Sequence, residues 1–441
     1  MARAVSGGDA GMSMMSLPEI IEIIPLNTET PADITVPGSK SITNRALIMA
    51  ALSKGRVTLR GALWSEDTQV MTDALRQLGF EITVAADEHE ASNRTITVQA
   101  LGGKIPNGGT AEKPLELFVG NAGTAARFLS ALVCLGDGVY RLSGVKRMHQ
   151  RPQAALLGAL RELGYRIDSP NDQLPAVIYG GGPRTGTCRV DLEESSQFGS
   201  ALLLGAVVGG WKIEFTGTEP DEAPYLKMTR ELIAAFPREG GEFVIEADAS
   251  SASYFVAANW LLNRTAETRI QVASYPVSTW QIDSVFPRFL PLPASVSRKS
   301  DLGDSIMTAI AIAPFASVPV TFTDLERLRV QESERVAGLR IQLTKCGAKV
   351  EEKGETLTVF PTGGKMHGAE IETYDDHRMA MCFGVLGLKI PGIKIKNPAC
   401  VKKTFPDFFQ KLAAKPPAGL GAVILDAATS RPLRTEQLFA H

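Results

Sequence analysis

The chain repeats one order of segments six times, and this repetition constrains its fold more than any other feature. A short strand ends in a turn of small polar residues, and a helix of roughly ten to fourteen mostly apolar residues follows. Internal repetition limits a chain to a few architectures, so it is interpreted first. The six turns that open these helices begin at Gly38, Gly120, Ser195, Asp248, Gly303 and Asp375.

The helices that directly follow these turns are nearly apolar on all sides, which is typical of helices buried on every face. A second, amphipathic helix is clearest from Thr68, Pro152 and Ser333, and would cover the outside of a sheet. Gly79, Gly164 and Gly347 end these second helices, as expected for left-handed C-caps. Units of the type β-α-β-α-β, three in each half, predict an α/β fold of two similar domains that divide near Glu246.

Helix N-termini carry free N–H groups and a partial positive charge, so they bind anions. Any one of these polar turns is explained by helix capping alone. Six turns at one topological position predict instead a cleft between the domains that binds anionic ligands. Basic residues in or near these turns support this interpretation: Lys40, Arg45, Arg127, Lys146, Arg147, Arg151, Arg327, Arg329, Arg335, His377, Arg378, Lys402 and Lys403. Three acids accompany them, Asp304, Glu332 and Asp376, although Glu332 alone is also typical of an exposed acid at a helix start.

Composition excludes several classes of protein. The 441 residues carry a net charge of −2, whereas a nucleic-acid binder usually has a basic excess. The five cysteines are scattered without a CxxC pair, which favours reduced thiols and a cytoplasmic protein. No apolar run reaches the roughly 18 residues of a membrane helix. Residues 1–17 lack the apolar core of a secretory signal, and we expect a flexible tail there.

Motifs of other chemistries are missing from the sequence. It contains no P-loop, HExxH, GxSxG or strand-following GxGxxG motif, and the five histidines have no metal-ligand spacing. We therefore expect no metal and no organic cofactor.

Ten segments in the same order resemble the family of 5-enolpyruvylshikimate-3-phosphate synthases, from about Glu19 to about Leu412. Together, PGSKSITNRAL, GNAGTAARFL and YDDHRMAM are nearly diagnostic. The segments span residues 37–47, 120–129, 147–152, 195–198, 224–225, 248–255, 303–308, 329–336, 374–381 and 403–409.

The resemblance implies two domains, each of three βαβαββ repeats with buried helices surrounded by sheet, an inside-out α/β barrel. One domain would be discontinuous, formed by residues 1–38 and 246–441, and residues 39–245 would form the inserted domain. The active site would lie in the interdomain cleft, which closes on substrate.

The resemblance also assigns residues to roles. The catalytic residues would be Lys40, Asp304, Glu332 and His377. Phosphoenolpyruvate would be bound by Lys40, Gly123, Arg151, Gln197, Arg335, Arg378 and Lys403. Shikimate 3-phosphate would be bound by Lys40, Ser41, Arg45, Ser195, Ser196, Gln197, Tyr225, Asp304, Arg327 and Gln331. The implied reaction transfers the enolpyruvyl group to the 5-hydroxyl by addition and elimination through a tetrahedral intermediate, and releases phosphate.

The sequence departs from the family pattern near the acceptor phosphate. Glu222 stands where many members have Ser, Gln331 where many have Lys, and Arg327 where many have Asn. We expect Arg327 to compensate, so that shikimate 3-phosphate remains preferred over shikimate. Ala126 and Phe128 replace a common Met and Pro, which predicts altered sensitivity to glyphosate, the inhibitor that mimics phosphoenolpyruvate.

Other interpretations remain open. The acceptor could be UDP-N-acetylglucosamine or another cyclic alcohol, or the chain could be a non-catalytic, anion-binding paralogue. Retention of Lys40, Asp304, Glu332, His377 and Arg378 argues against the last. We expect a monomer in the cytoplasm, or in a plastid if the source is a plant, that binds these small molecules and neither nucleic acid nor membrane.

Overall fold

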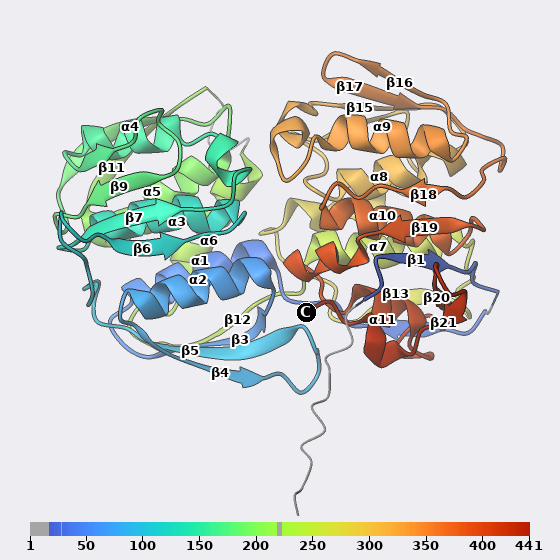
Figure 1. The fold of residues 1–441 in the computed structure, drawn as a ribbon, viewed down its shortest axis with the longest axis horizontal. Helices are drawn as coiled ribbons and strands as arrows, with labels where there is room; N and C mark the ends of the chain where they lie inside the picture. The colour runs from blue at the N-terminus through green and yellow to red at the C-terminus, as the bar shows by residue number, and fades with distance from the viewer. Residues whose placement is uncertain (1–16, 28, 218–222) are drawn as a thin grey trace, which may run out of the picture.

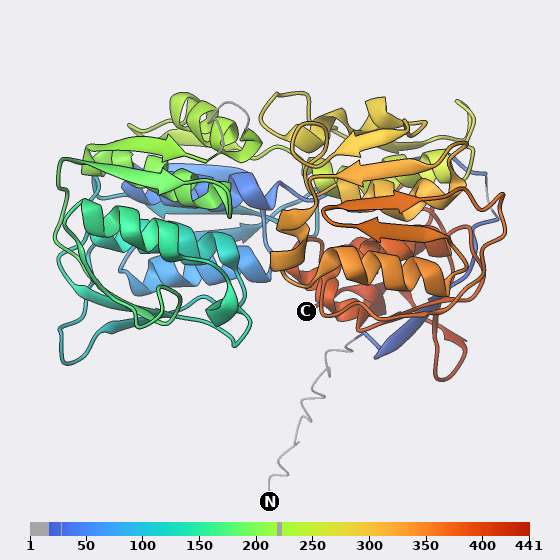
Figure 2. The same cartoon turned by 90° about the horizontal axis from the view of Figure 1, so that it is seen from above.

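The computed structural model describes residues 17–27, 29–217 and 223–441. Two lobes lie side by side in both views (Figure 1, Figure 2). Each lobe has its own cluster of buried apolar side chains. One cluster draws on residues 42–245, and the other on residues 17–36 together with 252–440. These two bodies are called the inserted lobe and the terminal lobe below.

Three sheets build the inserted lobe. In the first, the strand order is β12 (Gly241–Val244), β3 (Val57–Leu63), β5 (Asn93–Gln99) and β4 (Glu81–Ala86). In the second it is β6 (Leu115–Phe118), β7 (Val139–Ser143), β9 (Ala176–Tyr179) and β8 (Arg166–Asp168). The third pairs β10 (Gly186–Asp191) with β11 (Trp211–Thr216).

The terminal lobe also contains three sheets. One pairs β13 (Ile270–Val272) with β2 (Ala32–Ile34). The next has the order β14 (Ser295–Ser297), β15 (Val320–Thr323), β17 (Thr356–Val359) and β16 (Val350–Lys353). The last is β18 (Glu370–Ile371), β19 (Ile393–Lys396), β1 (Ile20–Ile23), β20 (Ile424–Asp426) and β21 (Arg431–Pro432).

The mostly apolar helices predicted after the six turns are all present, and their side chains are largely buried. They are α1 (Lys40–Leu52), α3 (Gly123–Cys134), α5 (Ser196–Gly209), α7 (Ala249–Leu261), α8 (Ile306–Ile312) and α10 (His377–Gly387). Every residue of α3, α8 and α10 is buried, because these helices are apolar on all sides. The helices α3, α5, α8 and α10 each connect two parallel strands of one sheet. Each of these four therefore starts from the carboxyl end of a strand, which aligns their N-termini.

The second helices predicted from the sequence are present, and each has a buried and a more exposed side. The three expected from the sequence are α2 (Glu66–Gln77), α4 (Ala154–Glu162) and α9 (Arg335–Lys345). Gly79, Gly164 and Gly347 follow them with positive φ of 93°, 85° and 87°, which confirms the predicted C-caps. Further helical segments are α6 (Pro224–Ala235), η3 (Ile282–Phe289), η5 (Glu326–Val330), η6 (Pro398–Lys403) and α11 (Phe408–Ala413).

The chain crosses between the lobes twice, and the two crossings are hydrogen-bonded to each other. Ser39 N donates to Glu246 O at 2.8 Å, and Asp248 N donates to Pro37 O at 2.8 Å. Gly38 lies between them, and a side chain there would collide with the carbonyl of Gly61. The crossings thus form one short two-stranded connection that requires glycine.

A buried polar cluster joins the lobes beside this connection. Glu90 of the inserted lobe accepts from Lys411 Nζ at 2.8 Å and from Thr35 Oγ1 at 2.6 Å, while Asp407 accepts from Ser92. Burial and the nearby Glu90 carboxylate raise the pKa of Asp407 to about 7. Lys411 neutralises one of the two carboxylates, so the other retains a proton near neutrality.

This cluster predicts how stability depends on pH. The pKa of Asp407 is raised from an ordinary value of about 3.9, so between about pH 4 and pH 7 the folded protein binds more protons than the unfolded chain. The free energy of unfolding should therefore fall as pH rises through this window, and Asp407→Asn should flatten the fall. Urea unfolding at several pH values measures it. Asp73→Asn, which removes an exposed carboxylate from α2, is the control. An unchanged pH slope in Asp407→Asn would contradict the assignment.

Candidate active site

A cleft between the lobes gathers the predicted site residues. Each residue predicted for the site lines the cleft except Lys403. Lys403 instead contacts Asp67, which is one of the lining residues. The inserted lobe contributes Lys40, Ser41, Arg45, Asp67, Gly123, Thr124, Arg127, Arg151, Pro152, Glu194, Ser195, Ser196, Gln197 and Tyr225. The terminal lobe contributes Arg298, Asp304, Arg327, Val330, Gln331, Glu332, Arg335, His377 and Arg378. The starts of α1, α3, α5 and α10 thus meet at one place, as the repeated turns predict.

Side-chain caps occur at only some of these helix starts. Ser195, Asp248 and Asp376 accept hydrogen bonds from backbone N–H groups of α5, α7 and α10. Within the described residues, no side-chain cap occurs at Ser39 before α1 or at Ala122 before α3. Capping therefore does not account for the polar turns before α1 and α3, and their N–H groups remain suited to an anion.

Several buried cationic groups in the cleft have an unused donor. The Nε atoms of Arg127, Arg151, Arg298 and Arg378 are buried and lack a hydrogen-bond partner among the residues that the structure describes. Leaving a buried polar group unpaired costs about 1–3 kcal/mol, and more when it is charged. A bound carboxylate or phosphate would satisfy these donors, so the cleft is built for anions.

Gly123 lies where two of these guanidinium groups approach the start of α3. A Cβ at this position would collide with Arg127 and Arg151. Arg151 donates to Asn121 O at 3.0 Å, and Arg127 donates to Pro152 O at 2.8 Å. The absence of a side chain at Gly123 therefore lets both arginines reach the anion-binding helix start.

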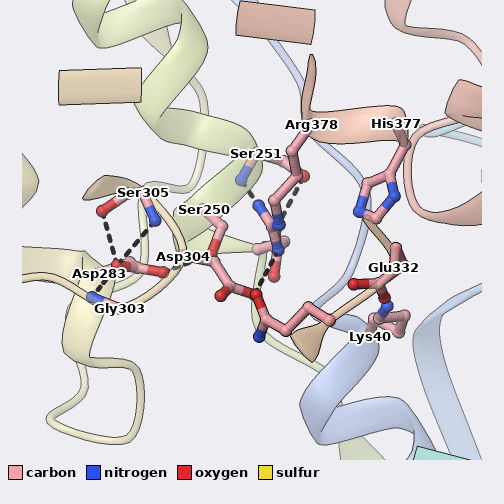
Figure 3. A network of polar contacts seen from close by, with 12 residues as sticks. Lys40, Ser250, Ser251, Asp283, Gly303, Asp304, Ser305, Glu332, His377 and Arg378 are labelled. Atoms are coloured by element: carbon pink, nitrogen blue, oxygen red, sulfur yellow. Dashed lines mark hydrogen bonds and ion pairs between the residues drawn. The ribbon is translucent and has the colours of Figure 1, made fainter. Parts of the chain in front are cut away.

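Asp304 lies at the centre of the terminal-lobe side of the cleft (Figure 3). Its carboxylate contacts Arg378 at 2.9 Å, Arg298 at 3.5 Å and Arg335 at 3.9 Å. Burial alone would raise the pKa of Asp304, but these three cations outweigh it and hold the pKa far below its usual range. Asp304 is therefore ionised and can accept a hydrogen bond.

Asp283, which the sequence motifs did not indicate, anchors the turn that carries Asp304 (Figure 3). Its Oδ1 accepts from Gly303 N at 2.7 Å, from Ser305 N at 3.2 Å and from Ser305 Oγ at 2.6 Å. Its Oδ2 accepts from Ser250 Oγ. Burial and the charge of Asp304 raise the pKa of Asp283. Asp283 thus fixes the residues on both sides of Asp304.

Arg335 holds the second predicted acid. It is 1% exposed and contacts Glu332 at 2.9 Å and Asp376 at 2.7 Å. Burial would raise the pKa of Glu332, but Arg335, Arg151 and Lys40 lower it well below the usual range. Glu332 is therefore ionised, and the alternative that it is an exposed helix acid is wrong.

His377 is completely buried at the start of α10, and its ring lies beside Glu332 (Figure 3). Neither ring nitrogen has a hydrogen-bond partner within the described part of the chain. Burial, together with the charges of Arg378 and Lys40, holds the pKa of His377 well below its usual value. The imidazole is therefore neutral and can donate from one nitrogen only.

Asp67 links two lysines from opposite lobes. Its carboxylate contacts Lys40 Nζ at 2.9 Å and Lys403 Nζ at 2.8 Å, and its side chain is 3% exposed. Lys403 also donates to Asn121 O at 3.3 Å. Asp67 thus holds Lys403, which was predicted to bind phosphoenolpyruvate, next to Lys40. In the sequence, Asp67 looks like an ordinary acid of a first helical turn.

The predicted acceptor end contains one cation that is largely occupied. Arg45 donates to Thr229 Oγ1 at 2.7 Å, to Ser41 O at 2.8 Å and to Ser200 Oγ at 3.1 Å. Its guanidinium lies 5.2 Å from the ring centroid of Phe128. Because α3 begins at Gly123, Phe128 falls in its second turn, where a proline would not pre-set the first turn of the helix.

Two arginines tie the loop around Gln331 across the cleft. Arg327 donates to Leu192 O at 2.6 Å and to Glu193 O at 3.1 Å, and Arg147 donates to Gln331 O at 3.0 Å. The side-chain oxygen of Gln331 accepts from Arg335. Glu222, the other departure from the family pattern, lies outside the described residues.

Sequence reasoning missed Asp67, Asp283, Thr124, Glu194 and Arg298, and did not assign Arg127 to the site. Thr124 and Arg127 lie within the segment GNAGTAARFL, whose match to the family gave them no role. Asp67, Glu194 and Arg298 sit outside the matched segments, and only the fold brings them to the cleft. Among the described residues, no cluster of His, Cys, Asp and Glu could hold a metal ion. The described helices also include none that is long and apolar enough to cross a membrane.

Solved structures that share this fold are enolpyruvyl transferases. An EPSP synthase from Acinetobacter baumannii superposes with a TM-score of 0.65, 21% identity, and coverage of 92% of this chain and 99% of its own. The enolpyruvyl transferase NikO from Streptomyces tendae gives a TM-score of 0.65, 16% identity, and coverage of 92% and 98%.

Sequence comparison then defines the family. The family model described as EPSP synthase (3-phosphoshikimate 1-carboxyvinyltransferase) matches residues 27–284 and 294–412. Relatives named 3-phosphoshikimate 1-carboxyvinyltransferase include one from Trichormus variabilis, 38% identical over 89% of this chain and 98% of its own, and one from Opitutus terrae, 37% identical over 90% and 98%. The chain belongs to the EPSP synthase family, which confirms the resemblance.

Asp283 provides a test of how the site is held. Asp283→Ala would leave two hydroxyls and two backbone N–H groups without their buried acceptor, so we expect a loss of about 2–4 kcal/mol in the free energy of unfolding. Misplacement of Asp304 should also lower kcat by about 10- to 100-fold. Urea unfolding and steady-state kinetics measure both. Asp283→Asn, which keeps one acceptor oxygen, should lose less. Wild-type kcat in Asp283→Ala would show that the turn needs no anchor.

Proposed function

We propose that this protein transfers the enolpyruvyl group of phosphoenolpyruvate to the 5-hydroxyl of shikimate 3-phosphate and releases phosphate. Membership of the family supports the reaction class. The observation that carries the proposal is the convergence of buried, unpaired arginine donors beside two ionised carboxylates. Two polyanionic substrates need many donors, and group transfer between them needs a proton acceptor and a proton donor.

The donor end of the cleft is proposed to lie at the starts of α1 and α3. Gly123 leaves room there for Arg151, while Lys40, Arg335, Arg378 and Lys403 surround the space near Glu332. A phosphate and a carboxylate would satisfy the free Nε donors of Arg151 and Arg378. Glyphosate, an anion of similar groups, is proposed to bind the same end.

The acceptor end is proposed to lie between the start of α5 and the turn of Asp304. Ser195, Ser196, Gln197 and Tyr225 come from the inserted lobe, and Asp304 comes from the terminal lobe. The ring hydroxyl would sit against Asp304, because its depressed pKa keeps that carboxylate ionised as a hydrogen-bond acceptor.

The proposed reaction is addition followed by elimination. The acceptor hydroxyl attacks the central carbon of phosphoenolpyruvate and gives its proton to Asp304, while Glu332 gives a proton to the methylene carbon. The tetrahedral intermediate then loses phosphate as the carbon–oxygen bond breaks, and the proton held by Asp304 leaves with the phosphate. A methyl proton returns to Glu332, which restores the double bond. Arg335 and Lys40 stabilise the charges, and the neutral His377 would donate a hydrogen bond.

Two domains related by a hinge would serve this chemistry. We propose residues 1–38 with 246–441 as one domain and 39–245 as the other, each an inside-out arrangement of three βαβαββ repeats. The separate apolar clusters and the short paired crossings at Gly38 and Ala247 support this division. Closure would exclude water from the reacting groups. We also propose a monomer, since the cleft is complete within one chain.

The first test is phosphate release from phosphoenolpyruvate with shikimate 3-phosphate, shikimate and UDP-N-acetylglucosamine in parallel. We expect release with shikimate 3-phosphate, and kcat/KM for shikimate lower by about 100-fold or more because a phosphate and its charge-assisted bonds are missing. A preference for either other acceptor would mean that the acceptor end has changed. Release with none would support a non-catalytic, anion-binding protein.

Glu332 gives a second test, of the mechanism. Its cationic neighbours keep it ionised, yet the proposed reaction needs a proton on it. Bound anions would compete for its cationic partners and raise its pKa, so forming a complex with shikimate 3-phosphate and glyphosate at pH 7 should take up about one proton. Calorimetry in buffers of different ionisation enthalpy counts the protons. Glu332→Gln should abolish the uptake and exposed Glu239→Gln should not. Equal uptake in Glu332→Gln would place the proton elsewhere.

A further inference from the structure

A second cavity adjoins the cleft at the acceptor end. It is lined by Glu193, Ala223, Pro224, Ile282, Lys299 and Asp324, among others, and shares Tyr225, Arg298 and Arg327 with the cleft. Arg298 and Arg327 therefore stand at the junction of the two spaces. Tyr225 reaches this junction from the inserted lobe, and the two arginines reach it from the terminal lobe.

Arg298 is a buried arginine whose charge is incompletely used. Its side chain is 9% exposed, and its Nε atom has no hydrogen-bond partner among the described residues. Its one ion pair there is long, 3.5 Å to Asp304, and Arg378 holds the same carboxylate at 2.9 Å. Arg298 N donates to Thr323 O at 3.1 Å, which fixes the backbone beside β14 and β15. A buried guanidinium with an unpaired Nε and only one long ion pair would be stabilised by a further anionic partner.

The rest of the acceptor end has few cations to spare. Gln331 is neutral, and its side-chain oxygen is already bonded to Arg335. Arg45 donates to the carbonyl and hydroxyl groups of its own lobe. A phosphate bound at the acceptor end therefore requires a positive charge from a residue other than Gln331 or Arg45.

Arg327 brings a second guanidinium to the same junction. Its bonds to Leu192 O and Glu193 O place it beside the chain that leads into Ser195 at the start of α5. Burial and the neighbouring charge of Arg298 lower the pKa of Arg327. Two like charges are thus kept near each other, and a dianion between them would relieve their repulsion.

We propose that Arg298 is a specificity-determining residue, and that with Arg327 it binds the phosphate of shikimate 3-phosphate in place of a cation at position 331. This inference rests on the proposed function and deepens it. The phosphate would be held from the terminal lobe by two arginines and from the inserted lobe by Ser195, Ser196 and Tyr225. Such a phosphate would therefore favour closure of the two lobes.

The experiment compares Arg298→Gln with the wild type in steady-state phosphate release. We expect KM for shikimate 3-phosphate to rise about 10- to 100-fold, because a charge-assisted contact is lost, while KM for phosphoenolpyruvate changes less than about 3-fold. The preference for shikimate 3-phosphate over shikimate should fall by the same factor. Arg298→Lys, which keeps the charge, should lose less. Arg340→Gln removes an arginine paired with Glu352 on the outer side of the same lobe and is the matched control.

A rescue variant separates loss of charge from loss of folding. Arg298→Gln with Gln331→Lys restores one cation at the neighbouring position and should recover at least about half of the lost affinity on a logarithmic scale. Thermal unfolding of each variant checks the fold. An unchanged KM for shikimate 3-phosphate in Arg298→Gln, or an equal loss with both acceptors, would overturn the inference.

Direct binding keeps this outcome distinct from failure of the proposed function. If the wild type released phosphate with no acceptor, the proposed function would fail, and calorimetric titration of shikimate 3-phosphate would still test the subsite. Weaker binding to Arg298→Gln than to the wild type supports the inference. Equal binding, or none to the wild type, overturns it.

Discussion

Arg335 is enclosed by carboxylates, and much of the cleft depends on this arrangement. A guanidinium that is 1% exposed could not be buried without partners, and Asp376, Glu332 and Asp304 supply them. The same contacts keep Glu332 and Asp304 ionised. The ion pairs that offset the cost of burying Arg335 therefore also keep both carboxylates deprotonated, and this is the state from which the proposed reaction starts.

The fold brings these groups together because its buried helices start at one place. Parallel strand pairs around α3, α5, α8 and α10 fix the direction of these helices, and the apolar surfaces of the helices fix their depth. Polar side chains at their starts, such as Ser196 and Arg378, are therefore placed at the cleft. Precision of the site thus comes from the packing of the two cores.

The sequence predicted the helices, their glycine caps and most of the residues that line the cleft, because hydrophobic periodicity and polar turns are local signals. It failed where a role depends on a distant neighbour. Asp283 lies in an unremarkable segment and acts only because Gly303 and Ser305 meet it in space. Arg298 belongs to no motif, and Asp67 resembles an ordinary acid of a first helical turn.

Several cations of the cleft contact acids and carbonyls of the protein, in the region where the proposed function places substrate anions. Asp67 holds Lys40 and Lys403 together, and backbone carbonyls accept from Arg327 and Arg147 across the lobes. These contacts reduce the electrostatic repulsion among the cations of the cleft. They nevertheless leave the Nε atoms of Arg127, Arg151, Arg298 and Arg378 without a partner among the described residues. An incoming anion therefore competes with these contacts, and it gains the buried Nε donors once the arginine side chains turn toward it. The contacts across the cleft hold the lobes near each other, so a ligand has little reorganisation to drive before the donors converge on it.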